Sequence, residues 1–183
     1  MKVRVDDLPP DGRSFEVEVG VPELIEALSG DRDGEFRWVG PAHGSVALSK
    51  AGRSLRVEGE AKFRFSEPCA RCLAEVDRPS VARFDLTKLL GPEPEHPSTR
   101  GLREEEVDED YLTEPEIDLD QVLLEQVALE LPQRVLCSDD CRGLCPHCGV
   151  NLNLESCHCT TQSVDPRFAV LAKLRGDGTP PKS

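Results

Sequence analysis

The chain has 183 residues, a formal net charge of −13 and eight cysteines. A chain of this length can bury one sizeable core, alone or together with a small metal-stabilised module. Its most apolar window, VLLEQVALEL, carries two glutamates, and its opening residues, MKVRVDDLPP, lack the apolar core of a signal peptide. We therefore expect a cytoplasmic protein that is neither secreted nor membrane-spanning and whose thiols stay reduced.

The acidic charge is concentrated in one segment. Residues 1–91 contain 16 acidic and 14 basic side chains, residues 92–120 contain 12 and 2, and residues 121–183 contain 7 and 6. The two flanking parts are therefore close to neutral. An RNA contact would have to come from a local basic face, for which the chain offers scattered arginines such as Arg134, Arg142, Arg167 and Arg175.

Residues 1–90 show the period-two alternation of half-buried antiparallel strands. The apolar positions are Val3 and Val5, then Phe15, Val17 and Val19, then Leu55 and Val57, then Ala61, Phe63 and Phe65. A further strand is expected over 81–86. The glycines expected to separate the strands are Gly12, Gly34, Gly44, Gly52 and Gly59.

One short helix is expected at Pro22–Leu28, with Leu24, Ile25 and Leu28 on its apolar face. Together these elements predict an α+β fold. Its N-terminal sheet is expected to be mostly antiparallel, either open or curled toward a barrel, with helices packed on it.

The segment 91–116 is rich in proline and acidic residues and shows no periodicity. This composition favours a solvated linker, and it also suits a docking strip for a basic protein. A helix that packs on the sheet is expected over 117–132. Asp118 is its N-cap, Pro132 ends it, and the apolar stripe is Leu119, Val122, Leu123, Val127 and Leu131. A last helix is expected from Asp165, within the C-terminal segment 163–183.

The eight cysteines are the residues with the clearest chemistry. Cys69 and Cys72 form one Cys-x-x-Cys pair, and the segment 133–162 holds six more, Cys137, Cys141, Cys145, Cys148, Cys157 and Cys159. In a reducing compartment, clustered thiols at this spacing predict a zinc-knuckle module with tetrahedral thiolate sites rather than disulfides. Eight thiolates suffice for two Zn²⁺ ions. An iron–sulfur cluster or free redox thiols are the alternatives.

The ligands divide most simply into two groups. The turn Cys145-Pro-His-Cys148 is followed by Gly149, which tolerates the positive φ of a metal knuckle, and Cys157 and Cys159 complete four ligands. The second site would then consist of the remaining thiols, Cys69, Cys72, Cys137 and Cys141. Three alternatives stay open. Cys137, Cys141, Cys145 and Cys148 could share one ion, His147 could replace a thiolate ligand, or His158 could replace one.

Four stretches of the chain together resemble a known family. They are PCARCL, the helix ending in ELP, LCSDDCRGLCPHCGVNLNLESCHC and DPRFAVLAKL. In order and spacing they are similar to the YceD family, the large ribosomal RNA subunit accumulation proteins. The resemblance implies a role in accumulation or processing of 23S rRNA, hence in large-subunit assembly, and it implies no catalytic residues. Some family members lack the CPHCG-type knuckle and keep the first cysteine pair, which is consistent with two separable sites.

We therefore expect a non-enzymatic factor in ribosome biogenesis. The expected partners are a ribosomal protein of the large subunit, pre-ribosomal 23S rRNA, or both, with no membrane and no small-molecule substrate. A basic ribosomal protein would suit the acidic linker. Two alternatives from other classes are a thiol–disulfide oxidoreductase that uses Cys69 and Cys72, and a zinc-stabilised protein–protein adaptor whose effect on rRNA is indirect.

Overall fold

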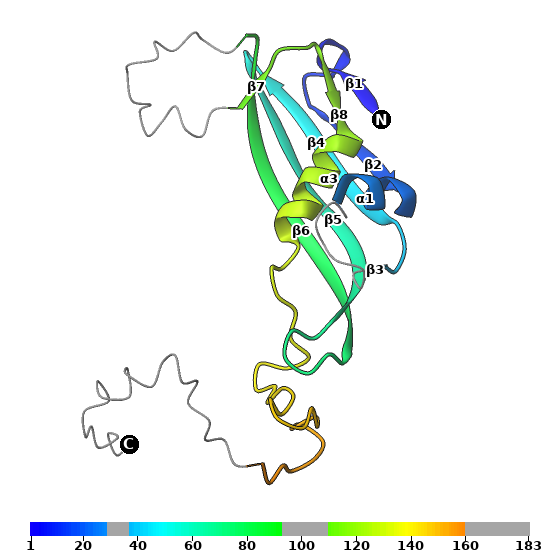
Figure 1. The fold of residues 1–183 in the computed structure, drawn as a ribbon. Coiled ribbons are helices and arrows are strands. Elements are labelled where there is room, and N and C mark those ends of the chain that lie inside the picture. The colour runs from blue at the N-terminus through cyan, green and yellow to red at the C-terminus, as the bar shows by residue number, and fades with distance from the viewer. Residues whose placement is uncertain (29–36, 93–109, 160–183) are drawn as a thin grey trace, which may run out of the picture. The chain divides into compact units, whose positions relative to one another are not determined.

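The computed structural model describes residues 1–28, 37–92 and 110–159. The chain forms two compact units, one over residues 1–141 and one over residues 142–183. All the helices and strands of the described residues belong to the first unit (Figure 1). The expected break at Gly34, most of the expected linker and the expected last helix from Asp165 lie outside the described residues.

A mostly antiparallel sheet forms the body of the first unit. Its path of paired strands is β2 (Arg13–Val19), β4 (Ala42–Ala51), β5 (Ser54–Pro68), β6 (Glu75–Leu90) and β7 (Asp110–Leu112), and the short β3 (Arg37–Trp38) also pairs with β5. Only the pairing of β6 with β7 is parallel among the strands described. The α+β expectation is confirmed. Over the described ranges β2 and β7 are not paired with each other, so the sheet is open and does not close into a barrel.

Two helices pack on this sheet, with α1 beside α3 (Figure 1). The α3 helix (Leu119–Glu130) begins at the predicted N-cap, because the Asp118 side chain accepts a hydrogen bond from the backbone N–H of Asp120. Its buried side chains belong to the predicted stripe and are Leu119, Val122, Leu123 and Val127. Neither described helix is long and apolar enough to cross a membrane.

The short helix α1 (Val21–Leu28) differs from its prediction in one residue. Leu24 is fully buried, but Ile25, expected on the same face, is 51% exposed. The helix contacts α3 and β3. Leu24 and the partly buried Leu28, which lie one turn apart, cover its packed side, so Ile25 faces solvent.

Two of the glycines expected to separate strands lie inside strands instead. Gly44 is within β4, where an added Cβ would collide with the Leu123 side chain of α3. Gly59 is within β5, where an added Cβ would meet the carbonyl oxygen of Ser45. These glycines therefore allow a helix and a neighbouring strand to approach closely. As a result β5 runs unbroken. It pairs with β4 from His43 to Ala51, and β4 is a strand that the sequence did not predict.

The end of the expected linker also forms strands. The short β7 pairs with the last residues of β6, and β8 (Glu116–Asp118) pairs with β1 (Lys2–Arg4), which a 3₁₀ turn, η1 (Val5–Asp7), follows. In this second ribbon, Lys2 lies opposite Asp118 and Arg4 lies opposite Glu116, so the acidic residues have complementary cross-strand neighbours. Leu112 and Ile117 pack on the core. The burial of these two side chains favours ordered strands here, although the surrounding residues are mostly acidic.

Candidate metal centres

The eight cysteine thiols gather into two groups of four. Within each group all the sulfur atoms lie within 4.8 Å of one another, and none of the cysteines forms a disulfide. We call the first group centre 1 (Cys69, Cys72, Cys137 and Cys141) and the second centre 2 (Cys145, Cys148, Cys157 and Cys159). This grouping is the simplest division that the sequence suggested. The alternative, in which Cys137, Cys141, Cys145 and Cys148 would share one ion, is not the arrangement in the structure. Neither His147 nor His158 belongs to a group.

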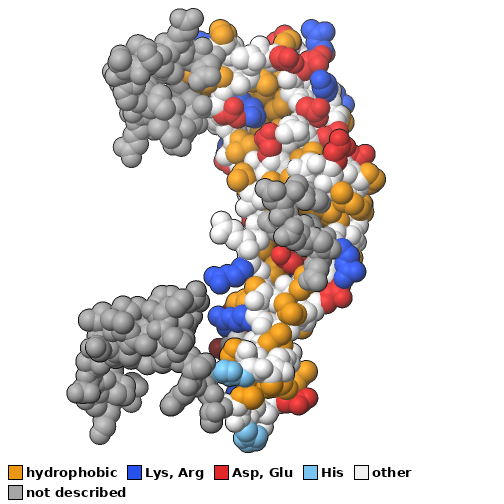
Figure 2. All heavy atoms as spheres, in the orientation of Figure 1, with side chains coloured by type: hydrophobic (Ala, Val, Ile, Leu, Met, Phe, Trp, Pro, Cys, Tyr) orange, Lys and Arg blue, Asp and Glu red, His pale blue; other side chains and the backbone are white. Residues whose placement is uncertain are grey.

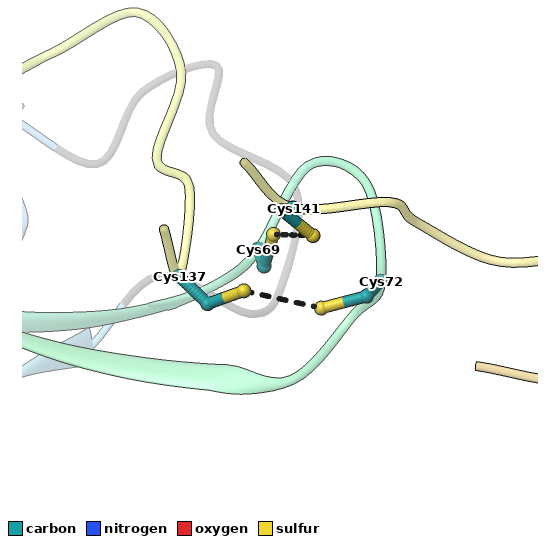
Figure 3. A group of neighbouring side chains, drawn as sticks. All are labelled: Cys69, Cys72, Cys137 and Cys141. Atoms are coloured by element: carbon teal, nitrogen blue, oxygen red, sulfur yellow. Dashed lines mark hydrogen bonds between the residues drawn. The ribbon is translucent and has the colours of Figure 1, made fainter. Parts of the chain in front are cut away.

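The first pair of centre 1 lies in the loop between β5 and β6. The backbone N–H of Leu73 donates to the carbonyl of Cys69 at 2.9 Å, and the N–H of Cys69 donates to the carbonyl of Ala74 at 2.8 Å. The N–H of Arg71 also donates to Cys69 Sγ at 3.5 Å. These bonds form a knuckle, a tight turn that directs the thiols of Cys69 and Cys72 to the same side (Figure 3).

The second pair of centre 1 comes from the segment that follows α3. The N–H of Ala70 donates to the carbonyl of Val135 at 2.9 Å, and Val135 is buried. The Arg71 guanidinium donates to the carbonyl of Cys141 at 2.8 Å and to that of Asp139 at 3.3 Å. Hydrogen bonds of the knuckle itself therefore hold this segment against it.

In centre 1 the four thiols point toward one another (Figure 3). The Sγ atoms of Cys69 and Cys141 are 3.7 Å apart, and those of Cys72 and Cys137 are 3.6 Å apart. Three of the four side chains are buried, and Cys137 is exposed.

Centre 2 is built on the same kind of turn. The N–H of Gly149 donates to the carbonyl of Cys145 at 2.9 Å, and the N–H of Cys145 donates to that of Val150 at 2.8 Å. The Sγ of Cys157 lies 3.3 Å from that of Cys145 and 3.5 Å from that of Cys148. Only Cys145 of this group is buried.

Two residues that sequence reasoning missed contribute to the first knuckle. Leu73 has φ 60°, at the position where centre 2 has Gly149 with φ 74°. Alignment of the two Cys-x-x-Cys turns would have identified it. Arg71, whose guanidinium bridges two carbonyls, has no local sequence signal, because its acceptors lie about 70 residues away.

Crowding of the thiols separates their pKa values. Burial raises the pKa of Cys69, but amide hydrogen bonds from Arg71 and Cys72 outweigh it and lower the pKa to about 6. Hydrogen bonds with Cys141 and Cys72 raise the pKa of Cys137 to about 12. In centre 2, amides of Cys148 and His147 lower the pKa of Cys145 to about 6, and Cys157 and Cys148 raise that of Cys159 to about 12. A nearby cation would favour the thiolate form of Cys137 and of Cys159.

The donor sets fit a tetrahedral thiophilic ion. Metal–sulfur bonds of about 2.3 Å in a tetrahedron place the sulfur atoms about 3.8 Å apart. The sulfur–sulfur distances above, 3.3 to 3.7 Å, are close to this value. Each group of four cysteines can bind a metal ion, and four thiolates would leave no coordination position open for a substrate.

The fold and its site together describe an α+β protein with an open sheet, packed helices and two four-cysteine groups that could each hold a metal ion. The family described as large ribosomal RNA subunit accumulation protein YceD matches residues 57–175, which include all eight cysteines. The chain belongs to this family.

Relatives extend this similarity. An uncharacterized protein of Mycobacterium tuberculosis is 41% identical over 109 residues, which are 59% of this chain and 49% of that protein. An uncharacterized protein of Mycobacterium leprae is 25% identical over 181 residues, 98% of this chain and 81% of that protein. A chloroplastic protein of Arabidopsis thaliana, named large ribosomal RNA subunit accumulation protein YCED homolog 1, is 29% identical over 158 residues, 74% of this chain and 49% of that protein. The chain thus spans about half the length of several curated relatives that it matches. No solved structure matches it significantly.

Proposed function

We propose that this protein is a non-enzymatic factor in ribosome biogenesis that supports accumulation of 23S rRNA and assembly of the large subunit. The observation that carries the proposal is membership in the YceD family, together with the name of the Arabidopsis relative. The partner is pre-ribosomal 23S rRNA, a large-subunit ribosomal protein, or both.

We further propose that each centre holds one Zn²⁺ ion. Zinc prefers a closed tetrahedral set of thiolates in structural sites, and both donor sets fit it. Cys69, Cys72, Cys137 and Cys141 would hold one ion, and Cys145, Cys148, Cys157 and Cys159 the other. Elemental analysis of the purified chain should find two zinc ions. Protein that is folded and free of bound metal would overturn this assignment.

The position of Cys69 and Cys72 argues against the oxidoreductase alternative. Redox Cys-x-x-Cys pairs commonly lie at the N-terminus of a helix, which lowers the thiol pKa and exposes the attacking sulfur. Here the pair lies in a hairpin loop followed by strand β6, and both side chains are buried against two further thiols. Such an arrangement favours metal ligation over disulfide exchange.

Depletion of the protein in cells that normally make it tests the ribosomal role. We expect the ratio of large-subunit to small-subunit rRNA to fall and to recover when the wild-type chain is supplied. The Cys69→Ser variant should restore the ratio poorly, because it lacks centre 1. An unchanged rRNA ratio after depletion would reject the proposed function.

A further inference from the structure

A polar hollow lies beside centre 1, within the first unit. Its volume is about 410 Å³, and it lies between β6 and the segment that follows α3. The residues that line it are Val76, Arg78, Arg134, Leu136, Cys137, Ser138 and Asp139. One wall therefore includes a cysteine of centre 1, so ligation of that cysteine would hold the wall in place.

Two arginines from distant parts of the chain line this hollow. Arg78 lies on β6, opposite Phe65 of β5, and Arg134 directly precedes Val135, which the knuckle holds through Ala70. Both arginine side chains are exposed. Neither forms an ion pair or a side-chain hydrogen bond with any residue in the part of the chain that the structure describes.

Several other arginines of the same sheet are neutralised by carboxylates. Arg56 donates to both carboxylate oxygens of Asp85 at 2.9 and 2.8 Å, and Arg64 makes the same two-pronged contact with Asp77. Figure 2 shows basic and acidic side chains interspersed over the face that it draws. The lining of the hollow holds one carboxylate, Asp139, and two guanidinium groups, so these three side chains together carry a charge of +1, and the thiolate centre that includes Cys137 lies beside them.

We propose that this hollow binds the phosphate backbone of single-stranded RNA, with Arg78 and Arg134 each contacting a phosphate. This inference rests on the proposed function, which supplies an RNA as partner. Guanidinium groups match phosphate oxygens with paired hydrogen bonds, and the Ser138 hydroxyl can donate a further one. An acidic protein is the less favoured occupant, because the proposed function supplies an RNA, which is a polyanion, and no acidic protein.

The test compares two double variants of the full, metal-loaded chain. Arg78→Gln/Arg134→Gln removes the two charges of the hollow. Arg56→Gln/Arg64→Gln removes two exposed arginines that are already paired with carboxylates on the same sheet. Both variants change the net charge equally. Binding of a fluorescently labelled, mixed-sequence single-stranded RNA oligonucleotide is followed by anisotropy across a range of salt concentrations.

We expect the hollow variant to bind the RNA roughly twentyfold more weakly at ~0.1 M salt. The slope of log affinity against log salt should become shallower by about 1.4, or ~0.7 for each lost phosphate contact. The control variant should bind within about twofold of wild type, because its arginines are exposed and already neutralised.

The assignment would be overturned if the wild type did not bind RNA or if both variants weakened binding equally. It would also be overturned by tighter, arginine-dependent binding of a polyglutamate peptide, or by loss of metal from the hollow variant alone. The last would mean that the arginines balance the charge of the thiolate centre. Unchanged affinity of the hollow variant, with rRNA still lost on depletion, would reject this site and leave the proposed function intact. Normal rRNA on depletion would reject the function, whatever the anisotropy shows.

Discussion

The two cysteine centres use the same kind of knuckle, but they differ in how far along the sequence their other two cysteines lie from it. In centre 1, Cys69 lies 72 positions from Cys141, and three of the four thiols are buried. In centre 2, Cys148 lies nine positions from Cys157, and one thiol is buried. An ion in centre 1 therefore joins a strand loop to the segment after a helix, whereas an ion in centre 2 closes a short local loop.

This difference predicts unequal contributions to folding. A structural zinc ion contributes about 10 kcal/mol or more to folding of small domains, against total stabilities of about 5–15 kcal/mol. Centre 1 should therefore govern the stability of the sheet-containing unit, and centre 2 only that of its own segment.

Replacement of one cysteine in each knuckle should separate the two roles and give the largest effect. Cys69→Ser should lose one metal ion and lower the melting temperature of the first unit, because the loop and the segment after α3 are no longer joined. Cys145→Ser should also lose one ion but leave that transition unchanged. Circular dichroism melting and elemental analysis measure both. Equal effects on melting would contradict the comparison.

Metal removal should distinguish the centres kinetically. The thiols of Cys148 and Cys159 are exposed, whereas Cys69, Cys72 and Cys141 are at most 5% exposed. A chromogenic chelator should therefore remove the ion of centre 2 first and that of centre 1 in a slower phase. The Cys145→Ser variant is the control and should show only the slow phase. Release in a single phase from the wild type would mean that burial does not protect centre 1.

The third residue of each knuckle gives a smaller, matched test. Arg71 in the first knuckle holds the segment after α3 through two carbonyls, whereas the corresponding His147 directs its backbone N–H to Cys145 Sγ. Arg71→Met should lower the metal affinity of centre 1 by about fivefold to tenfold, since such a bond contributes about 1 kcal/mol. His147→Ala keeps the backbone bond and should leave centre 2 unchanged. Competition titration measures both, and a loss only in His147→Ala would reverse the assignment.

The residue after each knuckle should give the smallest effect. Leu73 has φ 60° and is 65% exposed, so its replacement by glycine relieves strain and loses little burial. Leu73→Gly should stabilise the first unit by up to about 1 kcal/mol in chemical denaturation. Gly149→Ala should weaken metal binding at centre 2 by a similar amount, because no atom lies within 4 Å of the added Cβ and only the backbone is strained. Destabilisation by Leu73→Gly would show that the leucine side chain stabilises the fold.

Features set by neighbouring residues could be predicted from the sequence. The cap of α3 at Asp118 and its buried stripe depend on residues within a few turns of one another, and both are confirmed. The turn at Cys145–Gly149 likewise depends on five consecutive residues, and the glycine at its end tolerates the positive φ that the turn adopts.

Features set by distant residues could not be predicted in this way. From the sequence alone, Gly44 and Gly59 are expected to end strands. In the structure they lie inside strands, because the Leu123 side chain packs against Gly44 and the Ser45 carbonyl oxygen lies against Gly59, where a Cβ would not fit. The acidic residues before α3 form strands because β1 and the end of β6 offer them partners. Arg78 and Arg134 line one hollow only after β6 and the segment following α3 come together.

By itself, the sequence determined that eight thiols occur in knuckle-like spacing, that a capped amphipathic helix precedes most of them, and that the chain resembles the YceD family. Only the tertiary structure decided that Cys137 and Cys141 face Cys69 and Cys72 and that Arg78 and Arg134 line one hollow. The physical reason is the separation along the sequence of the residues that interact. Spacing along the chain determines turns and helix faces, whereas burial and strand pairing bring together residues that are far apart in sequence.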